Sequence, residues 1–79
     1  MTGYEVVQLN RLLEAKRIIR AQRRYFKKEH LYWAYNGVGA QHACCSLSIR
    51  LIDPTPEPGL FSCADSDVCK NCIREALQL

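Results

Sequence analysis

The chain has 79 residues, of which 48% are hydrophobic and 24% are charged, and its formal net charge is +3. A chain this short forms one domain, residues 1–79, which buries only about 60% of its unfolded surface and commonly depends on a metal, disulfides or a partner. No apolar run approaches the ~20 residues of a membrane span, and the N-terminus lacks the basic and apolar regions of a signal peptide. We therefore expect a soluble, cytoplasmic protein with no membrane partner.

The first half of the chain has the pattern of one long helix. Thr2 and Glu5 have the spacing of a capping box, and no Gly or Pro follows this box until Gly37. The glycine-rich sequence around Gly37 tolerates positive φ and predicts the end of the helix. We expect one helix, or two nearly continuous helices, over residues 1–36.

Seven positively charged side chains fall on one stripe of that expected helix at 100° per residue. They are Lys16, Arg17, Arg20, Arg23, Arg24, Lys27 and Lys28. Residues 1–30 carry eight Lys and Arg against three Glu, whereas residues 31–79 carry three against five acidic residues. Such a stripe favours nucleic acid or an acidic protein surface as the partner, because cations release counterions from phosphates. The alternative is an ordinary solvated helix face.

The apolar face of the expected helix changes position near Glu14. Leu9 and Leu13 project onto the side of the cations, whereas Ile18 and later apolar residues project onto the opposite side. Either the helix bends near Glu14, or its first turns are buried from a second direction by the cysteine-bearing half or a second subunit. A homodimer in which Leu9, Leu12 and Leu13 pack across a two-fold axis is one such arrangement.

The second half of the chain combines strand signals with turn signals. Residues 46–52 alternate polar and apolar side chains as a half-buried strand does, and residues 53–59 contain three prolines and a glycine. Residues 60–62 are the expected return strand. Good N-cap residues precede a last helix over residues 69–79. This order predicts a β-hairpin followed by a short C-terminal helix.

All five cysteines lie in the second half, and an odd number cannot all pair within one chain. Cys69 and Cys72 form a Cys-x-x-Cys pair at the start of the last helix, and His42 with Cys45 forms a His-x-x-Cys pair upstream. Two such pairs supply the four N or S ligands of a tetrahedral structural Zn²⁺ site. The candidate ligands are His42, Cys45, Cys69 and Cys72.

Several alternatives for these cysteines stay open. Cys44 could replace Cys45 as a ligand, and Cys63 could replace His42 to give an all-cysteine site. The thiols could also pack as small apolar residues, or form a disulfide or redox Cys-x-x-Cys, although a reducing compartment favours zinc. His30 lies within the expected long helix, where we interpret it as an exposed or packing residue.

No catalytic pattern accompanies these residues. The chain has no Gly-rich phosphate loop, His-Glu-x-x-His, His-x-Glu or nucleophile-elbow pattern. A catalytic zinc keeps an open coordination position, whereas the two pairs supply a closed set of four ligands. We therefore expect that the protein is not an enzyme.

Residues 49–54 (Ile-Arg-Leu-Ile-Asp-Pro) and 69–76 (Cys-Lys-Asn-Cys-Ile-Arg-Glu-Ala) carry a resemblance to a known family. This half resembles the treble-clef-like zinc fingers of the DksA/TraR-type regulators. The resemblance implies a helical N-terminal part joined to a C-terminal zinc finger, and an action on RNA polymerase. The chain departs from the family in its first ligand pair, which is Cys-x-x-Cys there and His42-Ala-Cys-Cys45 here.

These patterns together predict an α+β fold. A long N-terminal basic helix over residues 1–36 precedes a cysteine-rich part over residues 40–79, in which a structural Zn²⁺ holds a β-hairpin and a short C-terminal helix. The expected function is that of a small regulatory zinc-binding protein that binds nucleic acid or a nucleic-acid-handling complex through the basic helix. The alternative is a protein-interaction module, an accessory inhibitor or adaptor of a host enzyme of the viral or mobile-element type.

Overall fold

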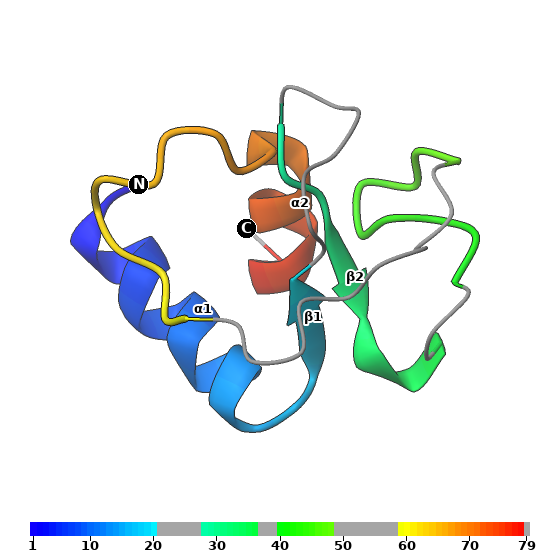
Figure 1. Cartoon of the computed structure of the whole chain (residues 1–79), viewed down its shortest axis with the longest axis horizontal. Helices are drawn as coiled ribbons and strands as arrows, with labels where there is room; N and C mark the ends of the chain where they lie inside the picture. The colour runs from blue at the N-terminus through cyan, green and yellow to red at the C-terminus, as the bar shows by residue number, and fades with distance from the viewer. Residues whose placement is uncertain (21–27, 37–39, 49–58, 79) are drawn as a thin grey trace.

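The computed structural model of the chain describes residues 1–20, 28–36, 40–48 and 59–78. In chain order, its elements are helix α1 (Gly3–Glu14), strand β1 (Ile18–Arg20), strand β2 (Leu31–Trp33), the 3-10 turn η1 (Ala34–Asn36) and helix α2 (Lys70–Leu77). Helix α2 packs against both α1 and β2 (Figure 1). The α+β class is confirmed, with an N-terminal helix, a hairpin and a short C-terminal helix.

Helix α1 begins as predicted but ends much earlier. The Thr2 side chain accepts a hydrogen bond from the Glu5 amide (3.2 Å), and the Glu5 carboxylate accepts one from the Thr2 amide (2.9 Å), which completes the capping box. The helix ends at Glu14, and Lys16 adopts the left-handed conformation with φ 57°. The predicted long helix over residues 1–36 is therefore wrong. The chain turns where the apolar face changes position.

Strands β1 and β2 form an antiparallel hairpin inside the segment predicted to be helical. Ile18 pairs with Trp33, and Arg20 pairs with Leu31. β-Branched and aromatic side chains dominate both strands, and these side chains pack well on a pleated surface. Ile18 and Leu31 are buried in the core. Burial of this apolar side of the hairpin against the helices replaces the helical packing that the sequence pattern suggested.

The hairpin predicted in the second half does not form this sheet. Residues 46–48 and 60–62 are described and are not strands. The remainder of that prediction, residues 49–58 with the proline-rich turn, lies outside the described residues.

Helix α2 confirms the predicted C-terminal helix. It follows Cys69 directly, and Cys72, Ile73 and Ala76 form its buried face. Gln78 ends it in the left-handed conformation. Neither of the two described helices is long and apolar enough to cross a membrane.

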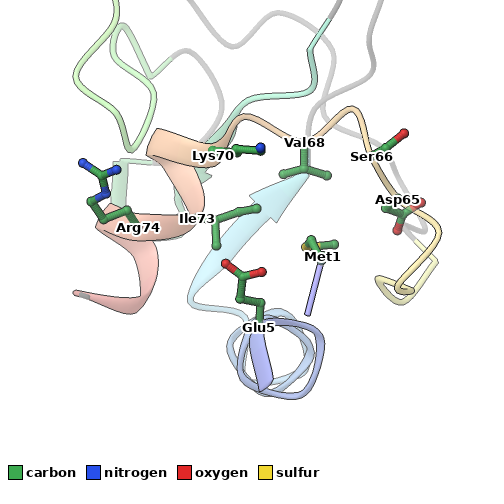
Figure 2. A pocket seen from close by; sticks show the side chains of 8 residues that line it. All are labelled: Met1, Glu5, Asp65, Ser66, Val68, Lys70, Ile73 and Arg74. Atoms are coloured by element: carbon green, nitrogen blue, oxygen red, sulfur yellow. The ribbon is translucent and has the colours of Figure 1, made fainter. Parts of the chain in front are cut away.

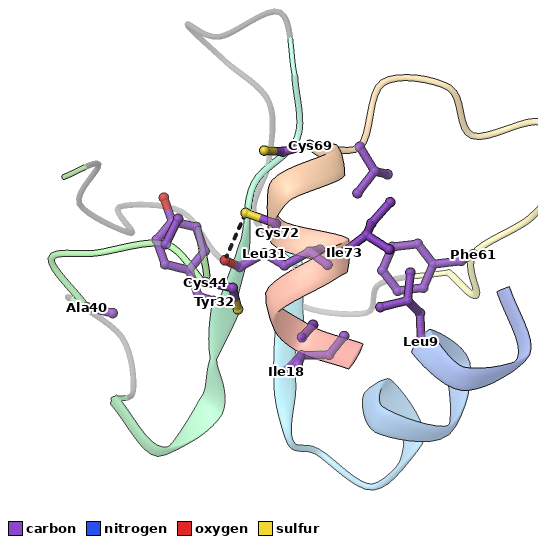
Figure 3. Close-up of a cluster of buried hydrophobic side chains, with 13 residues drawn as sticks. Leu9, Ile18, Leu31, Tyr32, Ala40, Cys44, Phe61, Cys69, Cys72 and Ile73 are labelled. Atoms are coloured by element: carbon purple, nitrogen blue, oxygen red, sulfur yellow. Dashed lines mark hydrogen bonds between the residues drawn. The ribbon is translucent and has the colours of Figure 1, made fainter. Parts of the chain in front are cut away.

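One cluster of buried side chains joins these elements (Figure 3). Its largest members with almost no exposure are Leu9 from α1, Leu31 and Tyr32 from β2, and Cys72 from α2. The two other leucines of α1 are partly buried against the same cluster. The leucines of α1 therefore pack within this chain, and the change in the apolar face requires no second subunit.

Arg20, predicted to face a partner, is instead the centre of an internal network. Its Nε and Nη2 donate to the two carboxylate oxygens of Glu29 (2.8 and 2.9 Å), and its Nη1 donates to the Gly59 carbonyl (2.8 Å). Its guanidinium also lies 4.1 Å from the centroid of the Phe61 ring. The hydrogen bond with Glu29 is the main cause that raises the pKa of Arg20. The network ties the hairpin to the segment that precedes α2.

Asn10 ties helix α1 to the same segment. Its side-chain amide donates to the Phe61 carbonyl (3.1 Å), and its side-chain oxygen accepts the Phe61 amide (2.7 Å). This pair satisfies both backbone groups of a buried residue that belongs to no strand. Phe61 is therefore held from both α1 and β1.

We expect Arg20→Ala to lower the free energy of unfolding by about 2–3 kcal/mol, because the largely buried Glu29 carboxylate loses both donors. Arg20→Lys should recover only part of this loss, since an ammonium cannot form the bidentate pair. Urea denaturation followed by circular dichroism measures the effect. Lys28→Ala removes an exposed charge and should change stability by less than about 0.5 kcal/mol. An equal effect of Arg20→Ala and Lys28→Ala would contradict the role of the network.

Candidate metal centre

The segment that carries Cys69 and Cys72 is held beside His30 by the backbone of Glu29, the residue before His30. The Glu29 amide donates to the Asp67 carbonyl (2.7 Å), and the Cys69 amide donates to the Glu29 carbonyl (2.8 Å). These two bonds form a short parallel bridge. The start of α2 is thereby fixed next to the residue that precedes His30.

The segment that carries Cys44 and Cys45 is held by the backbone of Leu31, the residue after His30. The Cys44 amide donates to the Leu31 carbonyl (2.7 Å). This segment is a tight turn, closed by the Ser46 amide on the carbonyl of the residue three positions earlier (2.9 Å), with Ser46 at φ 68°. The turn places the Cys45 sulfur against the imidazole of His30.

Four potential ligand atoms meet between these segments. Nδ1 of His30 and the Sγ atoms of Cys45, Cys69 and Cys72 all lie within 4.8 Å of one another. Nδ1 is 3.6 Å from the sulfur of Cys45 and 3.6 Å from the sulfur of Cys72. Figure 3 shows that Cys69 and Cys72 both come from the beginning of α2. This group can hold a metal ion.

The protonation of these residues is shifted by burial and by the start of α2. Burial raises the pKa of Cys69, but hydrogen bonds from the amides of Cys72 and Asn71 and from the thiols of Cys72 and Cys45 together outweigh it, so that the pKa is lowered overall. Burial is the main cause that raises the pKa of Cys72. Burial, with a smaller effect of Lys28, lowers the pKa of His30. The shifts at Cys69 and His30 favour thiolate and neutral imidazole, the forms that bind metals.

The structure brings together three of the four ligands predicted from sequence. Cys45, Cys69 and Cys72 belong to the group, whereas His42 is exposed and lies outside it. His30 takes the fourth place.

The sequence pattern does not identify His30 as a ligand because it predicts a helix over residues 1–36, whereas in the structure β2 directly follows His30. In a helix over residues 1–36, its side chain would lie far from the cysteine pairs. Because α1 ends at Glu14 and the chain returns as a hairpin, His30 instead precedes β2. The sequence feature that indicates a strand after His30 is Leu31-Tyr32-Trp33, because aromatic residues such as Tyr and Trp favour strands.

The two remaining cysteines, considered as alternative ligands, lie outside the group. Cys44 is buried, and burial followed by the neighbouring Cys45 raises its pKa to about 12. It packs in the core as a small apolar side chain, outside the group of four residues. Cys63 is exposed, and all five cysteines are free thiols.

The predicted cationic stripe is not a helix face in the described part of the chain. Lys16 and Arg17 lie in the turn between α1 and β1, Arg20 lies in β1, and Lys28 is exposed before β2. The others, Arg23, Arg24 and Lys27, lie outside the described residues. The stripe requires a helical rotation of 100° per residue, but α1 ends at Glu14, before the first cation of the stripe.

A surface pocket between α1 and α2 is separate from the Cys/His group of His30, Cys45, Cys69 and Cys72 (Figure 2). The described residues that line it are Met1, Glu5, Asp65, Ser66, Val68, Lys70, Ile73 and Arg74. Both charge signs occur around its apolar part, and none of the four grouped ligands is among these residues. The Cys/His group is therefore the candidate functional site.

Comparisons of the chain with models of known protein families, with curated proteins and with solved structures find no match. The assignment of a function consequently depends on the geometry and chemistry of the site.

We expect His30→Ala to lose its metal during dialysis against a chelator at a concentration where wild type keeps one ion per chain. The reason is that Nδ1 completes the set of four ligands. His42→Ala is the matched control and should retain the ion, because His42 lies outside the group. Elemental analysis of the dialysed proteins measures the stoichiometry. Metal retention by His30→Ala together with loss from His42→Ala would refute this ligand assignment.

Proposed function

We propose that the protein is a small, non-enzymatic regulatory protein whose fold is held by one structural Zn²⁺, and that it binds nucleic acid or a nucleic-acid-handling complex. One observation carries the zinc assignment. In a tetrahedral site with Zn–S of about 2.3 Å and Zn–N of about 2.0–2.1 Å, N and S ligands are about 3.6 Å apart. The distance from Nδ1 of His30 to the sulfurs of Cys45 and Cys72 is 3.6 Å in each case.

The donor set supports zinc over harder metal ions. Three sulfurs and one imidazole nitrogen form the Cys₃His set of structural zinc sites, whereas Mg²⁺ and Ca²⁺ prefer carboxylate, carbonyl and water oxygens. Four protein ligands fill the tetrahedron and leave no coordination position for a substrate. This closed set is the reason to propose a structural rather than a catalytic role.

A structural role also suits the way the ligands are distributed. His30 precedes β2, Cys45 lies in the turn that Ser46 closes, and Cys69 and Cys72 begin α2. One ion would therefore link three segments of a domain that is small for its own core. Zinc binding would then contribute directly to the free energy of folding.

Metal removal is expected to unfold the protein, and added zinc should refold it. Structural zinc binds zinc-finger peptides with an apparent 10–16 kcal/mol at pH 7, roughly as much as the whole stability of a typical domain. Near-ultraviolet circular dichroism and Trp33 fluorescence measure the loss of packing. Cys69→Ser should resemble the chelated protein, whereas Cys63→Ser, an exposed thiol outside the group, should resemble wild type. Cooperative folding that survives complete metal removal would disprove the structural role.

The distribution of charge supports nucleic acid as the partner class. Residues 1–30 carry eight Lys and Arg against three Glu. Arg11, Lys16, Arg17 and Lys28 are exposed in the described part of this segment, whereas the charge of Arg20 is neutralised by Glu29. Exposed cations are the groups that bind phosphates.

We expect the affinity for nucleic acid to fall steeply with salt. Each neutralised phosphate contributes about −0.9 to the slope of log K against log salt on a duplex and about −0.7 on a single strand. Four such phosphates, one for each exposed cation, would therefore give a slope of roughly −3 to −4. Fluorescence anisotropy across a salt series measures this slope. Salt-insensitive capture of one defined protein, without nucleic-acid binding, would instead support an accessory protein-interaction module.

A further inference from the structure

An aromatic pair stands at the end of β2 opposite to the metal-binding group. Trp33 ends β2 and Tyr35 follows in η1, with their ring centroids 6.2 Å apart and their planes at 22°. Trp33 is half-buried against the core, whereas Tyr35 is 81% exposed. The inner ring is therefore anchored, and it supports an outer ring that is accessible from solvent.

Two cations lie beside this pair. The Ala34 amide donates to the Arg17 carbonyl (2.9 Å), which continues the hairpin pairing beyond β1 and holds Arg17 opposite η1. Lys16 precedes it in the turn at φ 57°. Both side chains are exposed, and with Trp33, Ala34 and Tyr35 they line one surface hollow.

A second hollow extends this surface towards the helices. It shares Arg17 and Trp33 with the first hollow and includes Arg11 on the exposed side of α1. No Asp or Glu is among the described residues that line either hollow, and Glu14, the acidic residue nearest in sequence, belongs to neither. The continuous surface therefore combines cations from two hollows with an aromatic pair.

We propose that single-stranded nucleic acid binds across this surface, with a base stacked on Tyr35 and adjacent phosphates on Lys16 and Arg17. Unpaired bases present flat faces that stack on aromatic side chains, while their phosphates follow a positive groove. In a duplex the base faces are stacked inside, and only base edges are accessible in the grooves. An acidic peptide would use the cations but would leave the aromatic pair without a role.

This proposal rests on the proposed function, since it names the class of nucleic acid and its binding surface. The two parts can nevertheless fail separately. His30 precedes β2 and Tyr35 follows it, so substitutions at Tyr35 leave the four metal ligands in place. The zinc content of each variant then reports on the metal centre, and nucleic-acid affinity reports on the aromatic surface.

The test uses the zinc-loaded full chain and a short fluorescein-labelled oligothymidylate, with affinity measured by fluorescence anisotropy. We expect Tyr35→Ala to weaken binding roughly tenfold, because one stacked base is lost. Tyr35→Phe keeps the ring and should bind as wild type does. Tyr4→Ala is the matched control, because Tyr4 is a tyrosine on α1 with 60% exposure.

A second pair of variants tests the binding of phosphates. Lys16→Ala combined with Arg17→Ala should weaken binding and reduce the salt slope by about 0.7 for each phosphate that the protein no longer neutralises. Lys70→Ala combined with Arg74→Ala removes two exposed cations of α2 that line the pocket in Figure 2, and should leave the slope unchanged.

Three outcomes would overturn the proposal. Equal affinity of wild type and Tyr35→Ala, with zinc retained, would exclude stacking at this ring. Tighter binding to a duplex of equal length than to the oligothymidylate would exclude the preference for single strands. No binding of either probe by the zinc-loaded wild type would overturn this proposal and the nucleic-acid part of the proposed function, while the structural zinc would be unaffected.

Discussion

Backbone hydrogen bonds on either side of His30 hold both cysteine-bearing segments in place. The Glu29 carbonyl accepts a hydrogen bond from the Cys69 amide, and the Leu31 carbonyl accepts one from the Cys44 amide. Two segments that are far along the chain are thereby held next to His30. Three of the thiols that these segments carry, those of Cys45, Cys69 and Cys72, then lie within 4.8 Å of a ring nitrogen of His30. The carboxylate of Glu29 also binds the guanidinium of Arg20 in β1. The same short segment therefore couples the Cys/His group to the hairpin.

The surroundings of Cys69 and Cys72 shift the pKa values of these two thiols in opposite directions. Burial opposes ionisation of Cys72, while amides at the start of α2 favour the thiolate of Cys69. Cys44, adjacent in sequence to Cys45, also packs in the core but lies outside the group. Cys69 and Cys72 therefore both pack in the core and lie within reach of a histidine nitrogen, whereas Cys44 only packs. A cation at the centre of the group would offset the cost of deprotonating buried thiols, which would couple metal binding to folding.

Strand β2 connects two regions with different roles in the proposed function. His30, the one histidine of the group, directly precedes its first residue, and the aromatic pair lies at its other end. The four grouped residues are partly or fully buried, whereas Tyr35 and Arg17 are exposed. This division would let a small domain keep a rigid scaffold while it presents side chains to a partner. A half-buried Trp33 joins the two, since it packs on the core and supports the outer ring.

Local spacing in the sequence predicts the capping box of α1, the helix that follows Cys69 and three of the four grouped residues. It also predicts the α+β class, but with a hairpin over residues 46–62, whereas the strands of the structure are Ile18–Arg20 and Leu31–Trp33. The position of the hairpin, and with it the places of His30 and Arg20, depends on tertiary packing. Residues 15–36 contain no Gly or Pro and carry both helical and strand-favouring patterns, so local propensity is ambiguous there. Contacts with residues far along the chain resolve that ambiguity, namely the bridge of Glu29 with Val68 and the hydrogen bond of Arg20 to the Gly59 carbonyl, and no local pattern encodes them.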